Sequence, residues 1–138
     1  MASMSIDGLA MLSLSFDQMA ALPDDVLKDM AKAGGEVAAK AQSQKAKQML
    51  QGPYYSGAVA GATRVTKVSR TNDGAQAYVT FEGSSHGNTI AEIAFVNEYG
   101  KKRQPARPFI QTANEEAADD ILNAQAEVYN DWLNSENL

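Results

Sequence analysis

Residues 89–110 read TIAEIAFVNEYGKKRQPARPFI, and the structural signals in this stretch decide how the rest of the chain is arranged. Thr89 and Glu92 have the spacing of a capping box, in which a hydroxyl and a carboxylate satisfy free backbone N–H groups at a helix start. Gly100 stands where the chain needs positive φ to leave a helix, a conformation that glycine adopts at no steric cost. The stretch therefore predicts a short helix that supplies both of its own caps.

A basic segment that contains proline follows this helix. Residues 101–107, which we call the strap, read KKRQPAR and carry a charge of +4. Pro105 and Pro108 fix their own φ and push Gln104 and Arg107 into extended geometry. Pro108 also suits the first position of a following helix. These signals predict a stiff connector between two helices, and on physical grounds alone a plain interhelical loop explains them.

Two long stretches have the periodicity of amphipathic helices. Apolar side chains recur every three or four residues within 24–50 and again within 109–134. Aspartates open the first stretch, where they oppose the positive end of the helix dipole. The pair Gly34-Gly35 lies inside it, at a cost of about 1 kcal/mol per glycine relative to alanine. Either another backbone approaches closely at this pair or the helix kinks there.

Between the two long helices the pattern changes to alternation. Residues 58–81 place strand-forming side chains on both sides of a turn signal, TNDG at 71–74, which predicts an antiparallel hairpin. Residues 82–88 (EGSSHGN) predict a polar surface loop. Near the N-terminus, residues 6–14 predict a short strand and residues 15–19 one or two helical turns. These patterns therefore predict both helices and an antiparallel sheet in one chain.

These elements predict a single α+β domain over residues 1–138, with frayed ends at 1–7 and 134–138. In order, we expect a long helix, an antiparallel sheet built on a hairpin, a short capped helix and a long C-terminal helix packed on the sheet. No apolar run approaches the roughly 20 residues of a membrane span, and no basic signal-peptide region opens the chain. We therefore expect no contact with a membrane.

The chemistry-bearing residues argue against an enzyme. The absence of cysteine excludes a disulfide framework, a thiol nucleophile and a cysteine-ligated metal, and it fits a reducing cytoplasm. His86 is the only histidine, so a histidine metal cluster and a Ser-His-Asp triad both lack members. No phosphate-binding glycine loop is present. We predict no catalytic, metal or cofactor site, and a hydrolase that uses Glu98 or His86 is the remotest alternative.

Three elements, in this order, resemble the tail-component family of long-tailed bacteriophages and prophages. They are YYSGAV at 54–59, IAFVNEYG at 93–100 and PARPFI at 105–110. The family pattern has an Asn-Glu-aromatic-Gly-Thr element, from which Lys101 departs because threonine is common there. The resemblance covers residues 6–133. On it we base structural roles for six residues, which are Ser56, Gly57, Asn97, Gly100, Pro105 and Pro108.

The resemblance implies a non-enzymatic structural protein of the virion, assembled in the bacterial host cytoplasm. Members are described as tail completion, head-tail joining or tail terminator proteins, and related terminators form hexameric rings at the head-proximal end of the tail. The resemblance therefore implies a homo-oligomeric ring that contacts other neck and tail proteins, with transient contact with the genomic DNA that passes by.

Within such a ring, the strap would reach out of one subunit and pair with carboxylates of a neighbour. Arg107 is the best candidate for a bidentate contact, because a guanidinium fork matches a carboxylate. Phe109 would anchor the strap in the core. The predicted interface consists of Lys101, Lys102, Arg103, Arg107, Phe109, Glu98 and Tyr99.

Charge favours this hypothesis over a nucleic-acid reader. Residues 71–100 carry a charge of −4 and residues 108–138 a charge of −7, so the strap lies between two acidic blocks. The alternative is a small monomeric regulatory module that binds nucleic acid through the strap, with tyrosines as stacking groups. The net charge of −5 is opposite to the usual footprint of such proteins.

Overall fold

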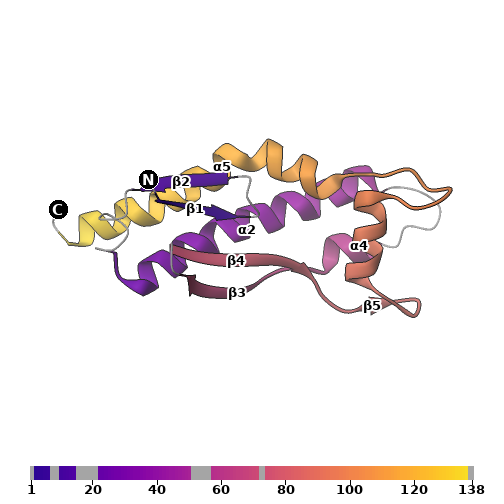
Figure 1. Ribbon diagram of the computed structural model, residues 1–138, viewed down its shortest axis with the longest axis horizontal. Helices are drawn as coiled ribbons and strands as arrows, with labels where there is room; N and C mark the ends of the chain where they lie inside the picture. Colours follow the sequence, from indigo (N-terminus) through magenta and orange to yellow (C-terminus); the bar gives the residue numbers. More distant parts are fainter. Residues whose placement is uncertain (1, 7–9, 15–21, 51–56, 72–73, 137–138) are drawn as a thin grey trace.

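Two long helices, α2 (Asp24–Met49) and α5 (Phe109–Ser135), lie side by side and antiparallel along the length of the molecule (Figure 1). The computed structural model describes residues 2–6, 10–14, 22–50, 57–71 and 74–136. Both helices begin at the predicted residue and end within one residue of the predicted position. Pro23 occupies the N-cap of α2, and Asp24 and Asp25 form its acidic first turn.

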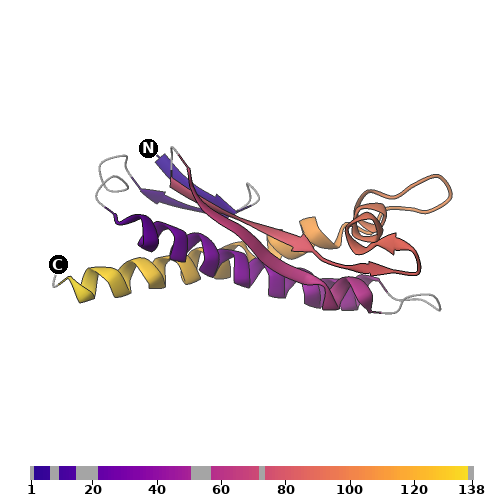
Figure 2. The ribbon, with the colours of Figure 1, turned by 90° about the horizontal axis from the view of Figure 1, so that it is seen from below.

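The strands form a second layer that covers the α2 side of the helix pair (Figure 2). The predicted hairpin is confirmed as β3 (Thr63–Thr71) and β4 (Gly74–Phe81), with Thr71 paired to Gly74. Its connection, residues 72 and 73, lies outside the described residues. Together the two layers give the predicted α+β fold, with the C-terminal helix packed against the sheet.

Close approach of the sheet explains one glycine of the pair in α2. A Cβ added at Gly35 would lie 3.0 Å from Cγ1 of Val65 and 3.5 Å from Cβ of Ala77. A side chain there would push β3 and β4 away from the helix, so the lost helix propensity is offset by packing. Of the two explanations left open by the sequence, close approach holds at Gly35.

Strand β3 is interrupted by a bulge. The register shifts between Thr66 and Ser69, so that two residues of β3 face one residue of β4. Lys67 in this bulge has a φ of 54°, in the left-handed region, and its Nζ lies 5.7 Å from the centre of the Tyr78 ring. Bulges and exposed lysines are devices that keep the edge of a sheet from pairing with another chain.

A second hairpin comes from the N-terminus. β1 (Ala2–Ile6) pairs with β2 (Ala10–Leu14), and β1 lies against β4 while β2 lies against α5. Residues 2–6 were expected among the frayed ends, and the strand expected at 6–14 is two strands. The helical turns predicted at 15–19 lie outside the described residues.

Two short elements differ from the prediction. Ala58–Gly61, expected as part of the β region, forms a helical turn, α3, because Val59 and Ala60 bury against α2 and Ser43 Oγ donates to the Ala60 carbonyl. The polar loop at 82–88 contains a hairpin of β5 (Ser84–Ser85) and β6 (Asn88–Thr89). Its two connecting residues, His86 and Gly87, both have positive φ, which is typical of a type I′ turn.

The core lies between the helix pair and the strands. Leu27 and Met30 of α2 are fully buried in one cluster with Ala75 and Ala77 of β4. Trp132 of α5 is partly buried and packs against this cluster. Within the described residues, none of the helices is both long and apolar enough to cross a lipid bilayer.

Two buried amides lie on α5 and differ in their partners. Asn114 Oδ1 accepts a hydrogen bond from Nε2 of Gln42 at 2.9 Å. Gln125 is fully buried, and neither polar atom of its side chain has a partner within the described part of the chain. A buried amide without a partner costs stability, because its hydrogen bonds to water are lost without replacement.

Candidate assembly interface

The short helix α4 (Ile90–Tyr99) carries the strap and lies at one end of the molecule (Figure 1). Its predicted N-cap is confirmed, since Thr89 Oγ1 accepts a hydrogen bond of 3.2 Å from the backbone N–H of Glu92. Gly100 ends the helix with a φ of 78°. A Cβ on Gly100 would lie 2.8 Å from the nitrogen of Ala106, so glycine is required both for its conformation and for space.

The first half of the strap is a tight turn rather than an extended connector. The backbones of Lys101 and Gln104 exchange two hydrogen bonds, each of 2.9 Å. Arg103 between them has a φ of 71°, which carries a steric cost for a residue with a side chain. The turn projects Lys102 and Arg103 into solvent.

The second half of the strap returns to the body of the protein. The backbone N–H of Arg107 donates to the carbonyl of Asn97 at 2.6 Å. The N–H of Phe109 then donates to the carbonyl of Arg107 across Pro108, whose φ of −76° and ψ of 69° form an inverse γ-turn. Pro108 is therefore the N-cap of α5 and not its first helical residue, which is Phe109. These bonds close the strap into a loop with fixed ends.

Phe109 fixes the strap to the core. Its side chain is fully buried, and its ring meets that of Phe81 edge to face at 5.9 Å between centroids. Such aromatic pairs add to the stabilisation that comes from burial alone. Phe109 thus has the anchoring position expected from the sequence, but it is not part of an exposed interface.

Glu98 caps α5 from within the same chain. Its side chain is 7% exposed; Oε1 accepts from the backbone N–H of Ile110 at 2.7 Å and Oε2 from that of Gln111 at 3.2 Å. A carboxylate at the first turn of a helix satisfies free N–H groups and complements the helix dipole. Glu98 was expected at the interface or, alternatively, in a hydrolase. Its carboxylate instead binds the N-terminus of α5 and so holds α4 against α5.

The exposed residues at this end combine aromatic rings with positive charge. Phe95 is 62% exposed and Tyr99 is 69% exposed, and their ring centroids lie 4.8 Å apart. Tyr99 was predicted at the interface from the sequence, whereas Phe95 was not. The available signal was the composition of α4, which is apolar on all sides and so leaves rings outside the core. The four cations of the strap, which follows Tyr99 and Gly100 in the chain, are also exposed, namely Lys101, Lys102, Arg103 and Arg107.

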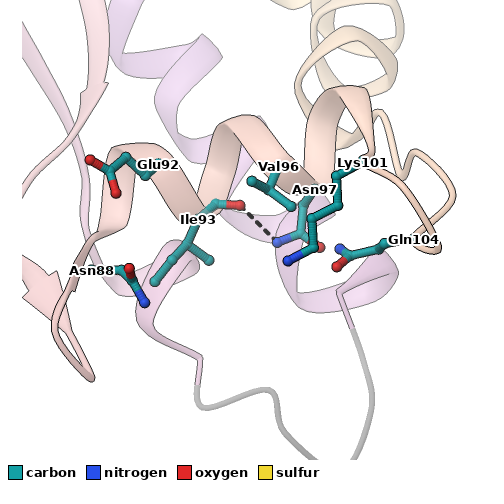
Figure 3. Close-up of a pocket in the computed structure, with 7 residues that line it drawn as sticks. All are labelled: Asn88, Glu92, Ile93, Val96, Asn97, Lys101 and Gln104. Carbon is teal, nitrogen blue, oxygen red and sulfur yellow. Dashed lines mark hydrogen bonds between the residues drawn. The ribbon is translucent and has the colours of Figure 1, made fainter.

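A hollow of about 290 Å³ lies along α4 beside the strap (Figure 3). Ile93 and Val96 provide its apolar wall, Glu92 lies toward one end and Lys101 toward the other, and Asn97 Nδ2 donates to the Ile93 carbonyl at 2.9 Å. In the described part of the chain no group of three or more histidine, cysteine or acidic residues is placed to hold a metal. Among the described residues that line the hollow there is no pair of carboxylates and no nucleophile with a base.

The remaining residues of the family motifs are Gly57, Ser56 and Pro105. Gly57 has a φ of 81° and forms the N-cap of α3. Ser56 lies outside the described residues. Pro105 is exposed on the strap, and His86 is exposed in the turn between β5 and β6.

Comparison of this chain with protein-family models, with characterised proteins and with solved structures found no match.

Proposed function

We propose that this chain is a structural subunit of a bacteriophage or prophage tail or neck, of the tail completion, terminator or head-tail joining type, which assembles into a ring. The supporting observation is the strap itself. Its cations are exposed, while its ends are fixed by the hydrogen bond of Asn97 to Arg107 and by those of Glu98 to α5, and Ala106 packs closely against Gly100. A plain connector between two helices does not need this construction, whereas a contact element benefits from being held rigid before it binds.

The distribution of charge supports association between copies. The basic strap lies at one end of the elongated molecule, and α5 runs from there to the other end (Figure 1). Its solvent side is acidic, with exposed Asp119, Asp120, Glu127 and Asp131, and the exposed Glu136 follows its last residue. Unlike charges on different surfaces of one molecule favour head-to-tail contacts, which close into rings when the rotation between subunits permits.

The test combines mass and shape. We expect native mass spectrometry of the full chain to give one defined multimer, and negative-stain images to show rings. The protein should also be present at a few copies in purified tails of the phage or prophage that encodes it. A stable monomer that binds DNA at nanomolar concentrations, with a steep dependence on salt, would instead support the nucleic-acid module.

Charge reversal on the strap tests its role directly. Arg107→Glu and Lys102→Glu should abolish rings while circular dichroism and thermal unfolding stay close to those of the parent. Lys28→Glu, the same change at an exposed position of α2, is the matched control and should assemble normally. Normal rings from both strap variants would mean that the strap is only a connector.

A further inference from the structure

A groove between α2 and α5 has the chemistry that complements the exposed end of α4 and the strap. Its floor is apolar, formed by Ala33 and Val37 of α2 and by Ala124 and Val128 of α5, and it encloses about 410 Å³. Among the described residues, its rim carries three carboxylates, Glu36, Glu127 and Asp131, and a single cation, Lys40. No ion pair involving these carboxylates is found in the described part of the chain.

We propose that this groove receives the Phe95–Tyr99 ring pair of a second copy of the chain, while Lys101, Lys102 and Arg103 of that copy pair with the acidic rim. This inference rests on the proposed ring, and it specifies which two surfaces meet. Aromatic rings that enter an apolar pocket, surrounded by charge pairs at the rim, are the usual anatomy of a binding hot spot.

The occupant is a second copy because the chain's own strap does not reach the groove. The strap is closed at Asn97 and Arg107, and α5 starts directly after it. Ala124 lies about 22 Å further along α5 at 1.5 Å per residue. A strap that is fixed at both ends does not span this distance, so an intramolecular contact is excluded.

Two other surfaces are poorer acceptors. The neighbouring groove, lined by Gln44, Gln48 and Ala113, has part of its rim charge already neutralised, because Lys45 Nζ lies 2.5 Å from Glu116 Oε2. The edge of β3 is interrupted by the bulge at Lys67, which prevents continuous pairing with a strand of another molecule. The groove over Ala33 and Ala124 is therefore the better match for a basic, aromatic partner.

The contact is heterologous, since the donor and acceptor surfaces are different and lie apart on the molecule. Each copy then donates its strap to one neighbour and accepts the strap of the other, which generates a ring or an open chain. This contact predicts that reversing the charge of one surface weakens association. Reversing the charge of the other surface as well should restore it.

The experiment uses two charge-reversed forms of the full chain. The groove form carries Glu127→Lys and Asp131→Lys, and the strap form carries Lys101→Glu and Lys102→Glu. Each alone should associate at least about tenfold more weakly than the parent, measured by sedimentation or native mass spectrometry. An equimolar mixture should assemble, because every junction then joins unlike charges. Glu82→Lys, at an exposed position outside α5 and outside the groove, is the control and should leave assembly unchanged.

A cross-linking measurement does not require complete rings. The chain has no cysteine, so Tyr99→Cys and Val128→Cys can be introduced in separate molecules. Mixing the two under mild oxidation should give a heterodimer well above the homodimer yield.

Rings that persist in the groove form, or a mixture that stays dissociated while the parent assembles, would overturn the groove assignment and leave the ring proposal standing. A parent chain that stays monomeric, together with Tyr99→Cys and Val128→Cys variants that give no cross-link, would overturn both proposals.

Discussion

Glu98 Oε1 lies 2.7 Å from the backbone nitrogen of Ile110, and this bond joins the end of one helix to the start of the next. The same carboxylate reaches the nitrogen of Gln111, so a single side chain satisfies two of the free N–H groups of α5. The strap between the two helices is thereby held at its base. Glu98, the acidic residue of the Asn-Glu-Tyr-Gly element, thus links α4 to α5 through two hydrogen bonds, which we call the clip. Its loss should lower the stability of the fold.

Removal of this clip should destabilise the fold. Glu98→Ala leaves two partly buried N–H groups without an acceptor, and we expect the free energy of unfolding to fall by about 1–3 kcal/mol. Glu98→Gln retains one carbonyl acceptor and should lose less. Urea unfolding followed by circular dichroism measures both. Glu92→Ala, an exposed change on the same helix, should stay within about 0.5 kcal/mol of the parent; equal losses at both positions would contradict the clip.

Three glycine-to-alanine variants separate backbone strain from steric conflict. Gly61 has room for a Cβ and a φ outside the left-handed region, so Gly61→Ala should be neutral or stabilise by up to about 1 kcal/mol. Gly57 has room but a φ of 81°, and its substitution should cost about 1 kcal/mol.

Gly100 has both problems, because its φ is 78° and a Cβ would meet Gln104 O at 2.9 Å. Gly100→Ala should therefore cost more than about 2 kcal/mol and weaken assembly through a displaced strap. Thermal unfolding of the three variants gives the order. A Gly100 variant no less stable than the Gly57 variant would show that the strap does not pack against Gly100 in solution.

The two buried amides should respond in opposite directions to the same substitution. Gln125→Met removes two polar atoms that have no partner among the described residues, and we expect a gain of about 1–2 kcal/mol. Gln42→Met breaks the bond to Asn114 and leaves that amide unsatisfied in the core, at a cost of about 1–3 kcal/mol. Chemical denaturation distinguishes the two. A loss of stability at Gln125 would mean that its amide binds an internal water.

The exposed rings should matter for association and not for folding. Phe95→Ser with Tyr99→Ser should change the free energy of unfolding by no more than about 1 kcal/mol, because both rings are mostly in solvent. Self-association measured by sedimentation should be lost. Tyr78→Ser, at an aromatic residue 44% exposed on β4, is the matched control and should assemble. If the double variant assembles like the parent, the ring pair lies outside the interface.

Elements set by local pattern could be predicted from the sequence. The periodicity of 24–50 and 109–134, the alternation around 71–74 and the caps at Thr89 and Gly100 each depend on residues close in the chain, and the structure has all of these elements. The compact turn of the strap was not predicted, because nothing in KKRQ favours positive φ at Arg103.

Two tertiary features, the cap by Glu98 and the groove between α2 and α5, could not be predicted from the sequence. The cap by Glu98 depends on the angle at which α4 meets α5, and the groove over Ala33 and Ala124 depends on how two distant helices align. The sequence pattern of a helix defines its faces but not its neighbours. This is why Glu98 was assigned to the interface.

The closed strap also has a mechanical consequence. A flexible tether pulled at Lys102 would straighten before it transmitted force. Here the turn is locked by the paired backbones of Lys101 and Gln104, and its base is held by Asn97 and Glu98. Load applied at the tip is therefore transmitted to α4 and α5 without first straightening a slack segment.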